Sequence, residues 1–180
     1  MHLRLSKYTS PLSELLIVTD SDGTLRALDF SDYELRMHRL LRDHYGDYTL
    51  ENDAPPTAVT HALDAYFEGR LTALDEVRTA TGGTPFQRDV WKALRTIEPG
   101  ITKTYGELAT AVGRPRASRA VGAANGSNPI AIVVPCHRVI GASGTLTGYG
   151  GGLPRKRWLL DHERRHTACE FVAYRALTSV

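Results

Sequence analysis

The residues best suited to chemistry in this sequence are Cys136 and its two successors, His137 and Arg138, which lie between two short apolar runs. Pro135 fixes its own φ and favours an extended Val134, so the cysteine would be held in a defined direction. Potential cations beside a thiol lower its pKa and raise the fraction of nucleophilic thiolate. The pattern therefore indicates a reactive cysteine on a turn that interrupts a buried strand.

A structural role for Cys136 is the alternative, because free cysteines are among the most buried residues. A neighbouring histidine does not decide between the two interpretations, and residue chemistry alone leaves both open. The chain has only one further cysteine, Cys169, and its seven histidines show no ligand-like spacing. We therefore expect neither a disulfide framework nor a bound metal.

The composition is that of an ordinary globular protein, with 42% apolar and 23% charged residues in a chain of 180. The sequence has no apolar run long enough to span a membrane, and residues 1–20 lack the order of a signal peptide. We therefore expect a cytoplasmic protein without membrane contact.

The charge is divided unevenly along the chain. Residues 1–80 hold 8 Lys and Arg against 14 Asp and Glu, a net charge of −6, whereas residues 81–180 hold 14 against 6, a net charge of +8. A basic half indicates a polyanionic partner, and nucleic acid is the main candidate. A solvated basic face is the alternative.

Residues 1–80 are predicted to form a small α+β supporting domain. The apolar run Leu15–Val18 predicts a strand, and Asp22-Gly23 predicts a hairpin turn after it. A helix should begin with Ser31 as its N-cap and end before Gly46, and a second should run from about Thr57 to Glu68. The inner face of the first helix would carry Leu35, Leu40 and Leu41.

The domain of residues 84–165 should follow a connection at residues 76–83, and residues 166–180 should form a tail. Thr84 and Thr104 are each followed three residues later by Gln or Glu, which predicts two helix starts with capping boxes. A helix from about Arg116 to Asn125 would complete a helix-turn-helix, and a last helix should run from Pro154 to about Arg164.

The helix predicted from about Arg116 is unusual because nearly all its side chains are small and Arg119 is the one long side chain that would face DNA. A reader of the DNA major groove needs several amide or guanidinium groups at base edges. Small residues instead permit close backbone approach to the narrow minor groove, with Arg119 wedged into the base stack. A tight helix–helix contact is the alternative. The candidate DNA-binding residues here are Ala117, Ser118, Arg119, Ala120, Gly122, Ala123 and Asn125.

A glycine-rich stretch, Gly148-Tyr149-Gly150-Gly151-Gly152, precedes the last helix. It lacks the Lys-Ser/Thr of a phosphate-binding loop, so we do not expect a nucleotide triphosphate or another cofactor.

Together these motifs resemble O6-alkylguanine-DNA alkyltransferases of the bacterial Ogt type. The resemblance is carried by Pro-Cys-His-Arg-Val-Ile, Tyr-Gly-Glu-Leu-Ala, Ser-Arg-Ala-Val-Gly, Asn-Pro and Gly-Tyr-Gly-Gly-Gly, all within residues 84–165. It implies an α+β fold, with a small ribonuclease H-like N-terminal α/β domain before a mostly helical domain. It also implies irreversible, single-turnover transfer of an alkyl group from O6-alkylguanine in double-stranded DNA, and from O4-alkylthymine, to the protein. Such a protein would be a monomer, and cooperative assembly on DNA is left open.

The resemblance also implies residue roles. Cys136 would accept the alkyl group, with His137 and Glu163 linked to it through water. Tyr105 would help rotate the nucleotide out and protonate the departing guanine, Arg119 would fill the vacated stack, and Asn128 would brace the turn. The base pocket would be lined by Pro135, Val139, Tyr149, Gly150 and Gly151.

General chemistry is consistent with these roles. Attack on an alkyl carbon suits a soft thiolate, and a base inside a duplex must be flipped out before it can react. Residues 1–80 contain no cysteine, so the chain departs from relatives with a structural zinc. The two alternative functions are a non-catalytic binder of alkylated DNA and a transcriptional regulator. The first should lack Cys136, and the second needs base-reading side chains that residues 116–126 do not offer.

Overall fold

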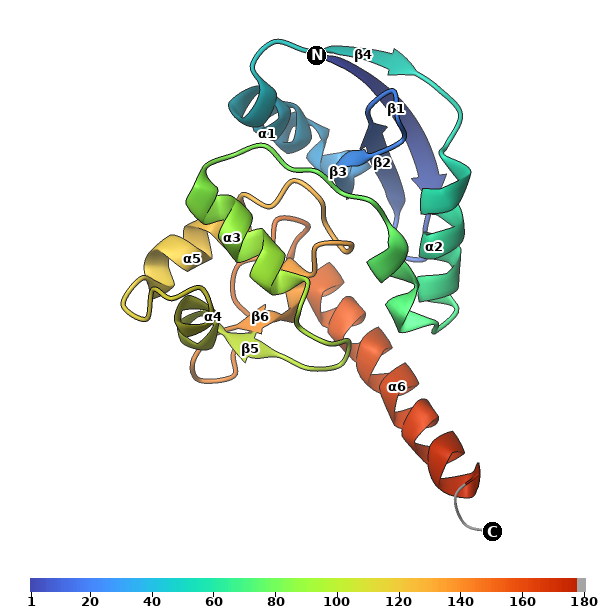
Figure 1. The fold of residues 1–180 in the computed structure, drawn as a ribbon. Coiled ribbons are helices and arrows are strands. Elements are labelled where there is room, and N and C mark those ends of the chain that lie inside the picture. The colour runs from blue at the N-terminus through green and yellow to red at the C-terminus, as the bar shows by residue number, and fades with distance from the viewer. Residues whose placement is uncertain (178–180) are drawn as a thin grey trace.

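The computed structural model describes the backbone of residues 1–177 and the side chains of residues 1–167. The N-terminal half is built on a four-stranded sheet of order β3-β2-β1-β4, drawn in blue and teal at the top of Figure 1. The first three strands form an antiparallel meander, and the last pairs parallel to the first. The strands are β1 (His2–Thr9), β2 (Glu14–Thr19), β3 (Leu25–Phe30) and β4 (Thr49–Asn52).

Strand β2 is covered on both faces, which explains its uninterrupted apolar run. Leu15 and Ile17 belong to the main core, whereas Leu16 and Val18 belong to a second cluster beneath helix α1 (Glu34–Tyr45). Helix α1 therefore covers one face of the sheet, and the other face meets the rest of the protein.

Two further elements complete this half. Helix α2 (Thr57–Phe67) packs against the short 3₁₀ helix η2 (Leu71–Glu76). The chain then returns along the sheet, where Thr79 forms a bridge with Leu25 of β3, before it enters the C-terminal half.

The C-terminal half is mostly helical, as Figure 1 shows in green to red. Thr84 and Thr104 both form complete capping boxes, which confirms the two predicted helix starts. Helices α4 and α5 form the expected helix-turn-helix pair. The elements are α3 (Pro85–Leu94), β5 (Lys103–Thr104), α4 (Tyr105–Ala111), α5 (Ser118–Gly126), the 3₁₀ helix η3 (Cys136–Arg138), β6 (Val139–Ile140) and α6 (Leu153–Leu177).

The two halves share one hydrophobic core rather than two separate ones. The main cluster runs from Leu15 in β2 to Leu159 in α6 without a break. Backbone hydrogen bonds join the halves as well, because Leu28 in β3 donates to the Pro129 carbonyl at 2.9 Å and accepts from Ala131 at 2.8 Å. Strand β3 therefore supports the segment that leads to Cys136.

Several local predictions were wrong. Ser31 makes no side-chain cap and lies in the 3₁₀ turn η1 (Ser31–Tyr33), and Leu35 is 88% exposed because α1 begins later than expected and Met37 takes the inner position. Residues 131–134 form a turn and a bend rather than a strand, after an isolated bridge between Ile130 and Leu28. Helix α6 extends to Leu177, well past the predicted end near Arg164.

Candidate active site

Cys136 opens the 3₁₀ helix η3, directly after Pro135, and is 4% exposed. The turns before it contain Ile132, whose φ of 67° lies in the left-handed region that β-branched residues avoid. Strain of this kind persists only where surrounding contacts impose it. The backbone before the cysteine is therefore held by its environment and not by local preference.

Asn128 provides much of that environment. Its amide nitrogen lies 3.1 Å from the Cys136 sulfur and donates to the carbonyls of Val134 at 2.8 Å and Ile130 at 3.2 Å. Its carbonyl oxygen accepts from the Ile130 amide at 3.0 Å. One buried side chain thus fixes both the turn and the direction of the thiol.

The environment of the thiol differs from the sequence-based prediction. Burial raises the pKa of the Cys136 thiol, and the Asn128 hydrogen bond, Arg36 and Lys156 only partly offset this effect. Arg138, expected to favour the thiolate, turns away and pairs with Glu163. The resting cysteine is therefore a thiol, and a nearby base has to accept its proton during reaction.

His137 is placed to serve as that base. It is fully buried, and its Nε2 lies 2.8 Å from Oε1 of Glu163 in α6. An imidazole nitrogen at this distance from a carboxylate carries the proton, so Nδ1 of the neutral ring is a free acceptor. Burial lowers the pKa of His137 although Glu163 opposes this, and Nδ1 has no partner among the described residues.

The Glu163 carboxylate is surrounded by donors. Arg138 donates from Nη2 to Oε1 at 2.8 Å and from Nε to Oε2 at 3.0 Å, Gly100 donates its amide to Oε2 at 3.0 Å, and Tyr66 donates its hydroxyl to Oε1 at 2.9 Å. Burial alone would raise the pKa of Glu163, but His137 and Arg138 hold it well below its usual range. The carboxylate is therefore ionised at neutral pH.

The glycine-rich loop closes over this group from the other side. The Tyr149 ring meets the rings of His137 and Phe30 edge-on, at centroid distances of 6.4 and 6.5 Å, and its buried hydroxyl has no partner among the described residues. A Cβ on Gly150 would lie 2.4 Å from Arg36, and one on Gly151 would lie 2.3 Å from Phe30. Glycine is required because the loop packs directly on the N-terminal half.

Lys156 anchors the same loop from below. Its fully buried ammonium group donates to the carbonyls of Val139 at 2.6 Å, Gly148 at 3.3 Å and Thr147. Burial lowers its pKa to about 8. Lys156 thus joins the backbone after the cysteine, at β6, to the loop around Tyr149.

The candidate DNA-binding face lies on α5 and the start of α4. Arg119 is exposed, and Tyr105 is half-buried with its hydroxyl 3.3 Å from the Thr147 carbonyl. The Tyr105 ring lies close to Gly122, where an added Cβ would be 3.7 Å from it. The small residues with some exposure on this face are Ala117, Ser118, Ala120, Gly122 and Ala123.

Asn125 was wrongly placed among the DNA-facing residues. It is 3% exposed, and its amide nitrogen points inward to the Cys136 carbonyl at 3.4 Å. Asn125 lies on the inner face of α5 with buried Val121 and Ala124, and therefore behind the cysteine.

Sequence reasoning also missed residues that contribute to this site, namely Tyr66, Lys156 and Arg36. Arg36 in α1 donates to the carbonyls of Gly126 at 3.1 Å and Asn128 at 3.0 Å and pairs with buried Asp29. Burial raises the pKa of Asp29 to about 6 despite this pair. An acidic residue in an apolar strand marks Asp29 as unusual in the sequence, but no local signal identifies Arg36 as its partner.

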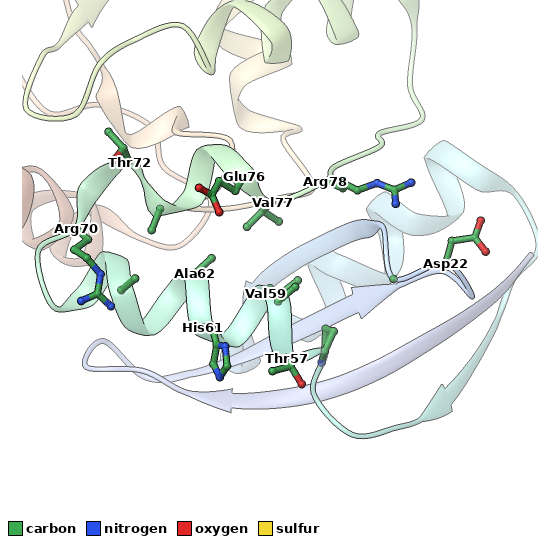
Figure 2. Close-up of a pocket in the computed structure, with 15 residues that line it drawn as sticks. Asp22, Thr57, Val59, His61, Ala62, Arg70, Thr72, Glu76, Val77 and Arg78 are labelled. Carbon is green, nitrogen blue, oxygen red and sulfur yellow. The ribbon is translucent and has the colours of Figure 1, made fainter.

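A separate hollow lies away from the cysteine. A groove of about 830 Å³ between α2 and η2, lined by residues such as Val59, Ala62 and Arg70, is shown in Figure 2. None of the candidate residues lines it, so it is not the site of the cysteine chemistry. No group of three potential metal ligands occurs in the described part of the chain, and no helix there is long and apolar enough to cross a membrane.

Two family models match this chain. Residues 3–81 match the family model described as "6-O-methylguanine DNA methyltransferase, ribonuclease-like domain", and residues 85–165 match "6-O-methylguanine DNA methyltransferase, DNA binding domain". A methylated-DNA–protein-cysteine methyltransferase of Salmonella typhimurium is 52% identical over 165 residues, which cover 91% of this chain and 96% of the relative. One from Mycobacterium tuberculosis is 51% identical over 139 residues, covering 76% and 84%.

Solved structures agree in fold. The Mycobacterium tuberculosis OGT in complex with DNA superimposes with a TM-score of 0.77 at 45% identity, covering 92% of this chain and 94% of that one. An O6-methylguanine-DNA methyltransferase from Pyrococcus kodakaraensis gives a TM-score of 0.69 at 26% identity, covering 89% and 98%.

Proposed function

This chain belongs to the 6-O-methylguanine DNA methyltransferase family, and on that premise we propose that Cys136 is the residue that accepts the alkyl group. The protein is a methylated-DNA–protein-cysteine methyltransferase, which repairs DNA by moving an alkyl group from O6-alkylguanine to one of its own cysteines. One observation carries the assignment of that cysteine. The Cys136 thiol is held by Asn128 and is followed in the chain by a buried imidazole that is hydrogen-bonded to a carboxylate.

The proposed step begins with the thiol proton. It passes, through a water molecule, to Nδ1 of His137, and Glu163 stabilises the resulting imidazolium. The sulfur forms a bond to the alkyl carbon while the bond from that carbon to guanine O6 breaks, and the departing guanine takes a proton from Tyr105. The products are a thioether on Cys136 and an unmodified guanine, and the proton taken up by His137 returns through solvent to the Tyr105 phenolate.

Access to the base requires DNA to be opened. We propose that α5 lies in the minor groove, that Arg119 occupies the space left in the stack, and that the flipped base enters between Tyr149 and the turn at Pro135 and Val139. The exposed small residues of α5 and the exposed Arg119 support this arrangement. Glycines 150 and 151 let the loop around Tyr149 pack directly on Arg36 and Phe30, and this contact supports a fixed position for Tyr149.

The test is intact-protein and peptide mass spectrometry after incubation with a duplex that contains O6-methylguanine. Wild type should gain one methyl group on the Cys136 peptide, and repaired guanine should stop at one equivalent, since water does not displace an alkyl group from a thioether. Cys136→Ser should gain none yet bind DNA with nearly unchanged affinity. The matched control is Cys169→Ser, which removes the chain's other thiol and should react as wild type does. Methylation of Cys136→Ser, or sustained turnover, would contradict the assignment.

A further inference from the structure

Tyr66 connects the N-terminal half to the proton-accepting pair. It lies in α2, is fully buried, and donates its hydroxyl to Glu163 Oε1 at 2.9 Å. This carboxylate oxygen is the one that also accepts from His137 Nε2 at 2.8 Å. The sequence separates Tyr66 from Glu163 by 97 residues, and the shared core of the two halves brings them together.

Oε1 is a crowded acceptor. Besides Tyr66 and His137, it accepts from Arg138 Nη2 at 2.8 Å and from Arg138 Nε at 3.2 Å. A carboxylate oxygen has about two lone pairs in favourable directions, so donors on one oxygen compete for the same charge. A donor added by Tyr66 therefore reduces the negative charge that Glu163 offers to His137.

The hydroxyl of Tyr66 remains a donor under all relevant conditions. Burial, and then the charge of Glu163, raise the pKa of the phenol well above its ordinary value. The ring makes its own packing contacts with Phe67 at a centroid distance of 5.4 Å and with His162 at 5.2 Å. Phenylalanine would keep these contacts and remove only the donor.

We infer that Tyr66 is a positioning residue of the alkyl-transfer reaction, whose hydroxyl orients the Glu163 carboxylate and limits the charge it offers to His137. Through this bond the N-terminal half sets the pH at which His137 can take the thiol proton. The inference rests on the proposed function, because it assumes that His137 accepts that proton.

The other titratable and charged groups around His137 are the same in wild type and in Tyr66→Phe. Those that face His137 and Glu163 are Arg138 of η3, Lys156 and His162 of α6, Tyr149 of the glycine-rich loop and Cys136 itself, with Asp29 and Arg36 behind Tyr149. Tyr66→Phe changes none of them. A change in the pH dependence of transfer would therefore report on the lost hydroxyl.

The experiment measures the single-turnover rate of methyl transfer against pH, with free O6-methylguanine and with duplex DNA as substrates. In Tyr66→Phe the acidic limb of the profile should move up by about 0.5–1 pH unit, because Glu163 binds the His137 imidazolium more strongly. The rate should fall more at pH 6 than at pH 8, and equally for both substrates. Tyr8→Phe is the matched control, since Tyr8 donates its hydroxyl to Asp64 of the same helix at 2.6 Å, at the exposed surface.

A purely structural role gives a different result. It would lower the fraction of active protein, read from the reaction plateau, and would leave the pH midpoint where it is, which would overturn the inference. Nitrogen NMR of isotopically labelled histidine provides a second measurement on the folded protein and should show a raised pKa for His137 in Tyr66→Phe. An unchanged pKa would also overturn it. Failure of wild type to methylate Cys136 would instead contradict the proposed function.

Discussion

The side-chain amide of Asn128 lies 3.1 Å from the sulfur of Cys136, and the same amide fixes the turn that leads to the cysteine. Position and reactivity of the thiol therefore depend on one buried side chain. An N–H donor stabilises a thiolate more than a thiol, so the contact assists proton loss that burial opposes.

Asn128→Ala should lower the free energy of unfolding by about 3 kcal/mol, because a buried polar group left without a partner costs about 1–3 kcal/mol. The Ile130 amide loses its hydrogen-bond partner, whereas the Val134 carbonyl keeps the bond from the Cys136 amide at 2.8 Å. Urea denaturation measures the loss. Asn125→Ala is a suitable control, since that amide makes a single longer bond of 3.4 Å and its carbonyl oxygen has no partner among the described residues. Equal losses in the two variants would contradict the role given to Asn128.

Glu163→Gln should weaken the protein in a pH-dependent manner. The pKa of Glu163 is lower in the folded protein than its ordinary value of 4.5, so its ionised form contributes stability above about pH 4.5. That contribution is lost as the pH falls through and below this value, toward the folded pKa. At pH 7 the variant also leaves Arg138 buried without its counter-charge, which costs about 3–5 kcal/mol.

The measurement is the unfolding free energy of wild type and Glu163→Gln between pH 3 and pH 7. The difference between them should be largest at pH 7 and should narrow toward pH 3. A difference that stays constant with pH would show that the carboxylate's charge is not what stabilises this part of the core.

Arg119→Ala should separate base extrusion from chemistry. Without the side chain that we propose fills the stack, extrusion loses about 1–2 kcal/mol, and transfer from duplex DNA should slow roughly tenfold. Reaction with free O6-methylguanine should be almost unchanged. Arg116→Ala serves as control, because Arg116 is also exposed but precedes α5. A matching loss with the free base would exclude the stack-filling role.

Tyr105→Phe tests proton donation to the departing guanine. The ring beside Gly122 is retained, so binding to DNA should change little. The chemical step should slow about 100-fold, within the range of general acid catalysis. Single-turnover rates at saturating DNA, compared with binding titrations, distinguish the two effects. If binding weakened in proportion to the rate, Tyr105 would act on the nucleotide and not on the proton.

Local signals in the sequence were sufficient for much of the architecture. Thr84 and Thr104 predict the starts of α3 and α4 correctly, because all the residues of a capping box lie within four consecutive positions. The same holds for the turn at Gly23, which adopts a φ of 75°. The same rule predicts a helix cap at Ser31 and is wrong there. The 3₁₀ turn Ser31–Tyr33 follows β3 directly, and the Ser31 hydroxyl makes no capping hydrogen bond.

The type of chemistry could also be predicted from the sequence. The Cys136-His137 pair and the single arginine among small residues are recognised from residue identity and order alone. The charge state of the thiol and the partners of Glu163 were decided by tertiary structure. Burial reversed the predicted shift of the Cys136 pKa, and Arg138 pairs with a residue 25 positions away. The packing of distant segments places Tyr66, Lys156 and Arg36 at the site. It also buries Asn125 away from the proposed DNA face. Hydrogen bonds and desolvation act over a few ångströms in space, whereas a sequence pattern records distance along the chain.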